Sequence, residues 1–326
     1  MRLGLTFDLQ TDPTDERQAE CDPPATIAAI QRALESLGHA VIRLGGAADL
    51  LARRPQDVDC VFNLAQGGHG RCREAWVPTL LDWHRIPYTG SDALALSAGL
   101  DKALCKQVAR AEGIATAAWI SFEPPAPLPA QMPLRFPLIV KPRGEGSGRG
   151  IDAGAVVRDR AALAARVSWL AARCPGPVLL EEFIAGGELT VCVIGNNPPQ
   201  AYPAIQRPLD PDTGLAYHVV APPPARSVSP LTLEPALEAE AGRLAVRMFE
   251  ALGCRDVARV DLRVDGAGRP WFLEINPLPS FDPAGSFGLL AESLGCSYAA
   301  LLGRVLDAAL ARCGLMPQPP SPRRGP

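Results

Sequence analysis

The strongest constraint on the fold lies near the C-terminal end, in the segment "ARVDLRVDGAGRPWFLEINPLP". Two strand-like runs flank a Gly-rich turn, a pattern that predicts an antiparallel β-hairpin. The second run is mostly apolar, yet it carries Glu274 and Asn276. Side chains two positions apart on a strand share a face, so the acid and the amide point the same way.

The register of this hairpin predicts which residues meet. If the first and last residues of the turn 265–270 pair with each other, Asp261 lies opposite Glu274 and Arg259 lies opposite Asn276. Opposed residues in a hairpin are about 5 Å apart. Carboxylate and amide oxygens at this spacing are ligands that Mg²⁺ prefers, and an arginine beside them suits developing negative charge.

An alternative interpretation is an edge hairpin whose polar face is only solvated. The apolar neighbours Val260, Phe272 and Ile275 favour a buried hairpin instead. Uncompensated carboxylates are unfavourable in such surroundings, so we expect a ligand at this face.

The basic residues are strongly biased. Only Lys102, Lys106 and Lys141 are lysines among 32 basic residues, which suggests that a slender ammonium is required at most of these positions. We expect Lys106 to be the one retained by chance. The near-neutral charge of −3 gives no sign of nucleic-acid binding.

Cysteines and the N-terminus indicate the compartment. Nine cysteines without a C-x-x-C pair predict reduced, mostly buried thiols in a cytoplasmic protein. The pair His69 and Cys72 is one pair of ligands short of a zinc site. No apolar segment long enough for a signal peptide or a membrane span opens the chain, so we expect no membrane partner.

Strand and helix patterns divide the chain into three units. The first alternates strands and helices, which predicts a parallel sheet with ligands at the carboxyl ends of its strands, after Asp8 and Ala65. The second is α+β, and the third contains a helix near 234–252 and the hairpin. We predict an N-terminal parallel α/β domain at 1–92, a central lobe with a Gly-rich flap at 93–185, a C-terminal lobe with the metal site at 186–313 and a disordered tail at 314–326.

A Gly-rich loop follows the strand that carries Lys141, in "PLIVKPRGEGSGRGI". The next segment, "IDAGAVV", has a strand pattern, so neither a dinucleotide fingerprint nor a P-loop is present. A flap whose amides and Ser147 cover phosphates fits this arrangement, and a plain surface turn is the alternative. Downstream, "VLLEEFIAGGELTV" can hold a purine and a ribose or can simply connect two domains.

In this order, the segments resemble the ATP-grasp enzymes, and most closely the D-alanine–D-alanine ligases. The resemblance covers "RIPYTGSDALALSAGLDKALCK", "IVKPRGEGSGRGI", "LLEEFIAGGELTV", the hairpin and the final "YAALLGRVLDAAL". It implies an ATP-grasp fold, α/β and α+β, with a parallel-sheet domain and two lobes that hold ATP. In that family a carboxylate attacks the γ-phosphate of ATP, and an amine then attacks the acyl-phosphate, which releases ADP and phosphate.

The resemblance also implies roles for individual residues. The nucleotide residues are Lys102, Lys141, Glu145 and Ser147 for the phosphates, Glu181, Phe183 and Ile184 for adenine, and Glu188 for ribose. The residues for chemistry are Asp261, Glu274 and Asn276 as ligands of two Mg²⁺ ions, and Arg259 with the amide of Ser280 at the acyl carbonyl, beside the flap residue Ser147.

The amino-acid half of the site departs from the family pattern. The nearest candidates for the acid that grips the first ammonium are Glu20 and Asp22, and Arg73-Glu74 replaces an acidic pair. The loop that usually carries Lys-Tyr is short, lacks the lysine and offers Tyr217. The serine for the second carboxylate is displaced to Ser286.

These observations favour an ATP- and Mg²⁺-dependent carboxylate–amine ligase acting on a small amino acid or dipeptide. D-alanine is one candidate substrate, and another amino acid is left open. The alternatives are an ATP-grasp phosphotransferase that stops at phosphorylation and an ATP-binding module without turnover. The resemblance, and no residue pattern, implies a homodimer.

Overall fold

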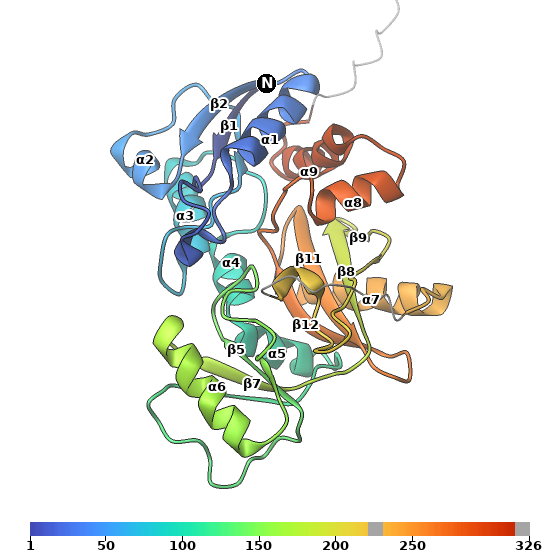
Figure 1. The fold of residues 1–326 in the computed structure, drawn as a ribbon. Coiled ribbons are helices and arrows are strands. Elements are labelled where there is room, and N and C mark those ends of the chain that lie inside the picture. Colours follow the sequence, from blue (N-terminus) through green and yellow to red (C-terminus); the bar gives the residue numbers. More distant parts are fainter. Residues whose placement is uncertain (221–230, 317–326) are drawn as a thin grey trace, which may run out of the picture.

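The computed structural model describes residues 1–220 and 231–316, and it contains three sheets that follow one another along the chain (Figure 1). Residues 317–326 of the predicted tail and 221–230 after the shortened loop lie outside the described residues. In the described part, no single helix is long and apolar enough to cross a membrane. One pair of helices, Ser286–Ser293 with Tyr298–Arg312, is long and apolar enough when taken together, but the pair is bent by 106°.

The first sheet is parallel, as the alternating strand and helix patterns predict. Its strands are β1 (Arg2–Thr6), β2 (Ala40–Gly45) and β3 (Cys60–Asn63), in the order β2-β1-β3. Its helices are α1 (Pro24–Ser36), α2 (Ala47–Ala52) and α3 (Trp76–His84), with short 3-10 turns at Glu16–Gln18 and Arg73–Ala75. The amide of Gly67, after β3, donates to Asp8 Oδ2, after β1, at 2.7 Å, so the two predicted ligand loops meet.

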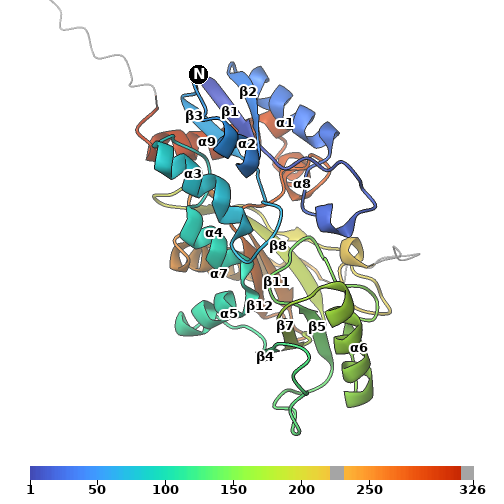
Figure 2. The same ribbon diagram turned by 90° about the vertical axis from the view of Figure 1, so that its left-hand side faces the viewer.

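The second sheet is antiparallel, in the order β4-β7-β5-β6. Helix α6 packs its apolar side against this sheet (Figure 2). The strand predicted from "IDAGAVV" is only two residues long. The elements of this unit are α4 (Ala93–Leu100), α5 (Lys102–Ala111), β4 (Trp119–Phe122), β5 (Leu138–Pro142), β6 (Val156–Val157), α6 (Arg160–Arg173) and β7 (Val178–Glu182).

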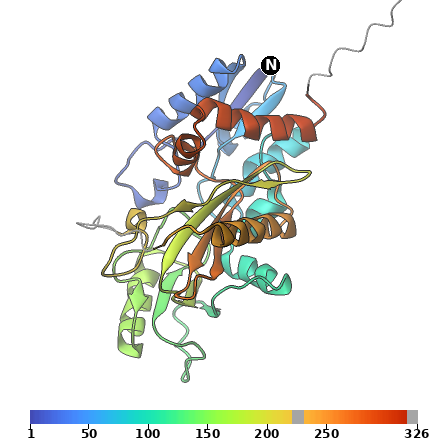
Figure 3. The same ribbon diagram turned by 90° about the vertical axis from the view of Figure 1, so that its right-hand side faces the viewer.

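The third sheet has the order β10-β8-β11-β12, with β9 beside β8. Helix α7 covers one face (Figure 3), and the residues on that face are apolar because strand side chains alternate. On the opposite face, Glu188, Arg259 and Asp261 line the cavity described below, whereas Ile194 and Val257 pack in the core with α9. The elements are β8 (Gly187–Ile194), β9 (Gln200–Ala201), β10 (Ile205–Gln206), η3 (Tyr217–Val219), α7 (Pro235–Ala251), β11 (Val257–Val264), β12 (Pro270–Asn276), α8 (Ser286–Ser293) and α9 (Tyr298–Arg312).

The β11–β12 hairpin confirms the pairs predicted for the site and corrects the turn. Asp261 lies opposite Glu274, and Arg259 lies opposite Asn276. Pro270, however, pairs with Val264 and not with Asp265. An irregularity between Asp261 and Leu262 shifts the register by one residue, as a β-bulge does, and this shift restores the predicted pairs at the site.

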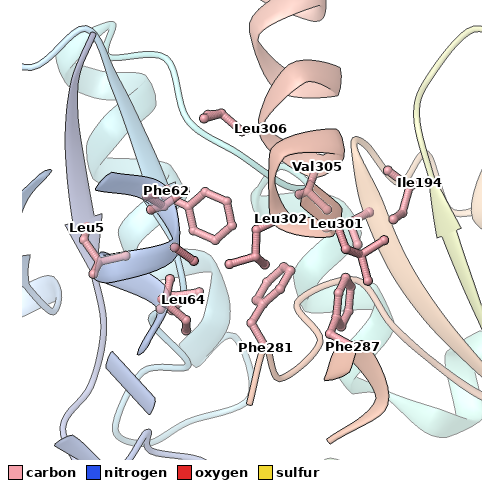
Figure 4. Close-up of a cluster of buried hydrophobic side chains, with 14 of the residues drawn as sticks. Leu5, Phe62, Leu64, Ile194, Phe281, Phe287, Leu301, Leu302, Val305 and Leu306 are labelled. Carbon is pink, nitrogen blue, oxygen red and sulfur yellow. The ribbon is translucent and has the colours of Figure 1, made fainter. Parts of the chain in front are cut away.

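One hydrophobic core joins the two ends of the chain (Figure 4). Leu5 and Phe62 of the first sheet pack with Leu302 of α9, and Ile194 of the third sheet belongs to the same cluster. The ring centroids of Phe281 and Phe62 are 5.4 Å apart, and the two rings pack edge to face. Helix α9 therefore lies between the first and third sheets and fixes how they face each other.

Candidate functional site

A cavity of about 530 Å³ lies between the Gly-rich loop after β5, the polar face of the third sheet and the loops that follow β1 and β12. We refer to it as the central cavity. Most residues that the sequence singles out line this cavity, although they come from all three units of the chain. The predicted residues that line it are Glu20, Asp22, Lys102, Lys141, Glu145, Ser147, Glu188, Tyr217, Arg259, Asp261, Glu274, Asn276, Ser280 and Ser286.

Asp261 is held by hydrogen bonds from several sides. Arg259 donates from Nε and Nη2 to its Oδ2, at 3.1 and 2.9 Å. Asn276 Nδ2 donates to the same oxygen at 3.3 Å, and Thr190 Oγ1 donates to Oδ1 at 2.7 Å. These donors fix the orientation of a carboxylate that is only 6% exposed. The polar face of the hairpin is thus a preorganised cluster and not a solvated edge.

Glu274 lies in the field of three cations. Its Oε2 is 3.4 Å from Lys102 Nζ. Burial alone would raise the pKa of Glu274, but Lys102, Lys141 and Arg259 outweigh burial and hold the pKa at about 2. The carboxylate is therefore ionised at neutral pH and offers its oxygens to a cation.

The lysine expected to be a chance remnant has a structural partner, so that expectation was wrong. Lys106 is fully buried, forms a short ion pair with Glu181 and donates to Thr116 Oγ1 at 2.7 Å. Lys141 Nζ lies 2.7 Å from the other oxygen of Glu181. Burial lowers the pKa of the Lys106 ammonium, and the Glu181 carboxylate opposes that effect. Sequence alone hid this role because Lys106 and Glu181 are 75 positions apart.

Arg263, which the sequence analysis missed, organises the segment expected to contact adenine and ribose. Its Nη1 donates to Glu188 Oε2 at 3.1 Å, and its Nε donates to the carbonyl of Ile184 at 3.0 Å. The guanidinium also lies over the ring of Phe183, 4.9 Å from the centroid. Glu181, Phe183 and Ile184 are not among the residues that line the central cavity.

The Gly-rich loop is tied to the N-terminal unit. Glu20 receives a bidentate contact from Arg73, with Nε at 2.9 Å and Nη2 at 2.6 Å from Oε2. The amide of Gly146 donates to Glu20 Oε1 at 2.8 Å, and Arg73 Nη1 donates to the carbonyl of Gly144 at 3.1 Å. We call this group the Glu20–Arg73 clamp. Glu74 is buried beside it, and burial with nearby Glu20 raises the pKa of Glu74 to about 8.

A second arginine that the sequence analysis did not identify, Arg207, lies at the other end of the central cavity. Arg207 Nε donates to Thr190 Oγ1 at 3.0 Å, and its Nη2 donates to Ser286 Oγ in a short contact. Thr190 in turn donates to Asp261, so Arg207 is linked to the hairpin through one hydroxyl. No carboxylate of the described residues pairs with Arg207 within 4.0 Å. The only signal in the sequence is an arginine next to the short β10, which is too general to identify a site.

The family model for the C-terminal part of D-Ala–D-Ala ligases matches residues 108–307. A relative from Synechococcus sp. (strain JA-3-3Ab), a D-alanine–D-alanine ligase, is 36% identical over 306 residues. That alignment covers 91% of this chain and 91% of the relative.

Solved structures share the fold. A D-alanine–D-alanine ligase from Bacillus anthracis in complex with ATP superposes with a TM-score of 0.77 at 23% identity, covering 96% of this chain and 98% of its own. The VanG D-Ala:D-Ser ligase from Enterococcus faecalis superposes with a TM-score of 0.73 at 18% identity, over 94% and 99% of the two chains. At these low sequence identities, both comparisons show a shared fold and do not assign roles to individual residues.

Proposed function

Because the chain belongs to the D-alanine–D-alanine ligase family, we propose that its central cavity activates a carboxylic acid with Mg²⁺ and ATP and then joins it to an amine. Membership makes the protein an ATP-dependent ligase with the ATP-grasp fold. In the proposed sequence, a carboxylate oxygen of the acid attacks the γ-phosphorus and ADP leaves. The amine then attacks the acyl carbon, the bond from that carbon to the phosphate oxygen breaks, and an amide and inorganic phosphate result.

The observation that carries the proposal is the meeting of the hairpin's oxygens with the lysines of the second unit. Asp261, Glu274 and Asn276 supply hard oxygen ligands from paired strands, and Lys102 already lies 3.4 Å from Glu274 as a cation. This donor set fits Mg²⁺. These three residues would hold two Mg²⁺ ions. When bound there, the ions would neutralise the negative charge of the ATP phosphates.

The protein's own cations complete this environment. Lys102 and Lys141 line the cavity and would contact the phosphates, and the flap residues Glu145 and Ser147 would cover them. Ser147 has a φ of +50° and is followed by Gly148 at +71°, a tight backbone turn that exposes consecutive amides. We assign Glu181, Phe183, Ile184 and Glu188 to the nucleoside side of the same ligand.

The acyl group would be held by Arg259 and the amide of Ser280. Arg259 donates to Asp261 through two nitrogens, and this contact holds its guanidinium beside the proposed metal ligands. Fixed donors aimed at a developing oxyanion lower the barrier because they need no reorganisation during the reaction.

The substrate is an amino acid or a dipeptide, and we propose D-alanine as the first to test. The rest of the cavity differs from the family pattern at the Arg73-Glu74 pair beside Glu20 and at the displaced Ser286, which Arg207 contacts. These differences support a changed preference for at least one of the two substrates.

A screen for ADP formation tests the proposal. Purified protein is incubated with ATP, Mg²⁺ and single amino acids, pairs of amino acids or dipeptides, and ADP, phosphate and amide product are measured. We expect ADP and phosphate in equal amounts, with one amide formed for each, and loss of all three on removing Mg²⁺ with a chelator. ADP formation with neither free phosphate nor consumption of an amine would contradict ligation and identify a phosphotransferase instead.

A further inference from the structure

Thr190 is a buried residue whose hydroxyl links two charged side chains of the central cavity. It lies on β8, directly opposite Asp261 of β11, and only 1% of it is exposed. Its Oγ1 donates to Asp261 Oδ1 at 2.7 Å and accepts from Arg207 Nε at 3.0 Å. Arg207 is fixed in turn, because its backbone amide donates to the carbonyl of Glu188 at 2.8 Å and its Nη2 donates to Ser286 Oγ in a short contact. The side chains of Arg207, Thr190 and Asp261 therefore form one continuous chain of hydrogen bonds.

Arg207 determines where the Thr190 hydroxyl points. A hydroxyl has a single proton to donate, whereas the nitrogens of an arginine donate and do not accept. Arg207 Nε occupies a lone pair of Thr190 Oγ1, so the proton of this hydroxyl is left for Asp261. Without Arg207, the hydroxyl would no longer be held in that orientation.

The two oxygens of Asp261 differ in the hydrogen bonds that they receive. Oδ2 accepts two from Arg259 and one from Asn276, at 2.9 to 3.3 Å. A carboxylate oxygen has about two lone pairs, so Oδ2 is fully occupied. Among the residues that the structure describes, Oδ1 accepts a hydrogen bond from Thr190 alone. The oxygen that Thr190 orients is therefore the one with a lone pair left for a cation.

We propose that Thr190 and Arg207 are positioning residues, which present Oδ1 of Asp261 to a divalent cation without contacting the cation themselves. The inference rests on the proposed function, because that function makes Asp261 a ligand of Mg²⁺. Hydrogen bonds to a ligating carboxylate fix its orientation, and the loss of such an outer partner weakens metal binding by about 10- to 100-fold. Arg207 would thus act on the metal site through Thr190.

The affinity for Mn²⁺ tests this role without turnover. Mn²⁺ takes the same oxygen ligands as Mg²⁺, and the electron paramagnetic resonance signal of free Mn²⁺ gives the bound fraction in the presence of ADP. We expect Thr190→Val, which keeps the shape of the side chain and removes the hydroxyl, to weaken Mn²⁺ binding by about 10- to 100-fold. Thr190→Ser keeps the hydroxyl and should bind Mn²⁺ nearly as the wild type does. Thr232→Val, at an exposed threonine outside the cavity, is the matched control.

Arg207→Met separates positioning from direct binding of an anionic substrate group. By charge alone, removing a cation near the site would strengthen Mn²⁺ binding, so a weakening is the sign of lost orientation. If Arg207 acts through Thr190, the double variant Arg207→Met/Thr190→Val binds Mn²⁺ no more weakly than Thr190→Val, because the two losses are not additive. Arg207 is partly exposed, so its variant keeps the test valid if Thr190→Val does not fold.

Several outcomes would overturn the proposal. One is wild-type affinity for Mn²⁺ in Thr190→Val, and another is an equal loss in Thr190→Val and Thr190→Ser, which would assign the effect to packing. Unchanged Mn²⁺ affinity in Arg207→Met, with a raised KM for a substrate, would make Arg207 a substrate-binding residue instead. Failure of the wild-type protein to bind Mn²⁺ with ADP would contradict the metal site of the proposed function itself.

Discussion

At the scale of single residues, the proposed reaction centre depends on the charge of Glu274. Lys102, Lys141 and Arg259 all act on this carboxylate, and together they overcome the effect of burial on its pKa. The same three cations are those assigned to the phosphates and the acyl group. In this structure Glu274 thus neutralises part of the positive charge of these three side chains. When the nucleotide binds, Glu274 would share them with its phosphates.

Replacing Glu274 tests this shared role. We expect Glu274→Gln to lower ADP formation by at least about 100-fold, since it removes a fixed charge from the reacting region. The amide keeps the shape of the side chain, so the protein should still fold and show one cooperative melt. Glu250→Gln, an exposed position on α7, is the control. Wild-type turnover in Glu274→Gln would refute the metal assignment.

A substitution of Lys106 tests the stability of the protein and not its catalytic chemistry. It pairs with Glu181 in the interior, and removing one partner of a buried ion pair leaves a charge poorly compensated. We expect Lys106→Met to lower the free energy of unfolding by about 3 kcal/mol, measured by urea denaturation. Lys141 still contacts Glu181, so the folded state should persist.

Gln107→Met is the matched control for that substitution, because Gln107 is exposed on the next position of the same helix. Equal stabilities of the two variants would show that the buried pair contributes nothing beyond an apolar side chain.

At the scale of elements, the hairpin shows how far the sequence alone could lead. Period-two patterning predicted the face shared by Glu274 and Asn276, and the Gly-rich turn predicted the antiparallel partner. The exact turn pairing could not be predicted, because a bulge adds one residue without changing the polar pattern. Alternating strands and helices likewise predicted the parallel first sheet, but not the six-residue α2, which is too short for a periodic pattern.

The remaining site residues were out of reach for a different reason. Arg207 and Arg263 act through contacts with segments distant in the sequence. Arg207 meets Ser286 across 79 positions, and Arg263 meets Ile184 across 79 as well. No local period or turn signal encodes such pairings, so only the folded arrangement reveals them.

The start of α8 provides a test at this scale. A Cβ on Gly288 would lie 1.6 Å from the carbonyl oxygen of Pro283, so the helix can approach the loop after β12 only with glycine there. We expect Gly288→Ala to destabilise the protein by about 1 to 3 kcal/mol, the range for overpacking. It should also weaken catalysis, because Ser286, which lines the central cavity, lies on the same turn of α8.

Gly303→Ala in α9 is the control. There the new Cβ would lie 3.3 Å from the flexible end of Leu37, and alanine favours a helix over glycine by up to about 1 kcal/mol. Thermal melting of both variants decides the matter: a lower melting temperature for Gly303→Ala than for Gly288→Ala would contradict the packing argument.

At the scale of the whole molecule, the predicted boundaries near 92 and 185 stay a prediction, and the cores show how the units depend on one another. On the α9 side, the core of the first sheet is shared between α1 and α9. Leu3, Leu5 and Phe62 are covered by α9, and Arg312 at its end forms an ion pair with Asp256 at 2.7 Å. We therefore expect the first and third units to unfold together.

Leu302→Ala probes this coupling, because Leu302 is fully buried between the units. We expect a loss of about 2 to 5 kcal/mol in the free energy of unfolding, in a transition that remains single when followed by circular dichroism and by tryptophan fluorescence. Leu289→Ala, at a side chain that is 43% exposed, should have little effect. Two separate transitions in Leu302→Ala would show that the units are independent.

The position of α9 also bears on how the chain is made. The ribosome makes the strands that carry Leu3, Leu5 and Phe62 long before Tyr298–Arg312, the helix that covers them together with α1. At about 5 to 20 residues per second, the ribosome needs roughly 12 to 50 s to add the roughly 240 residues between Phe62 and α9. For that time the apolar surface that α9 covers lacks its cover, and α1 alone packs against this side of the sheet. We therefore expect the first sheet to benefit from a chaperone until α9 has been made.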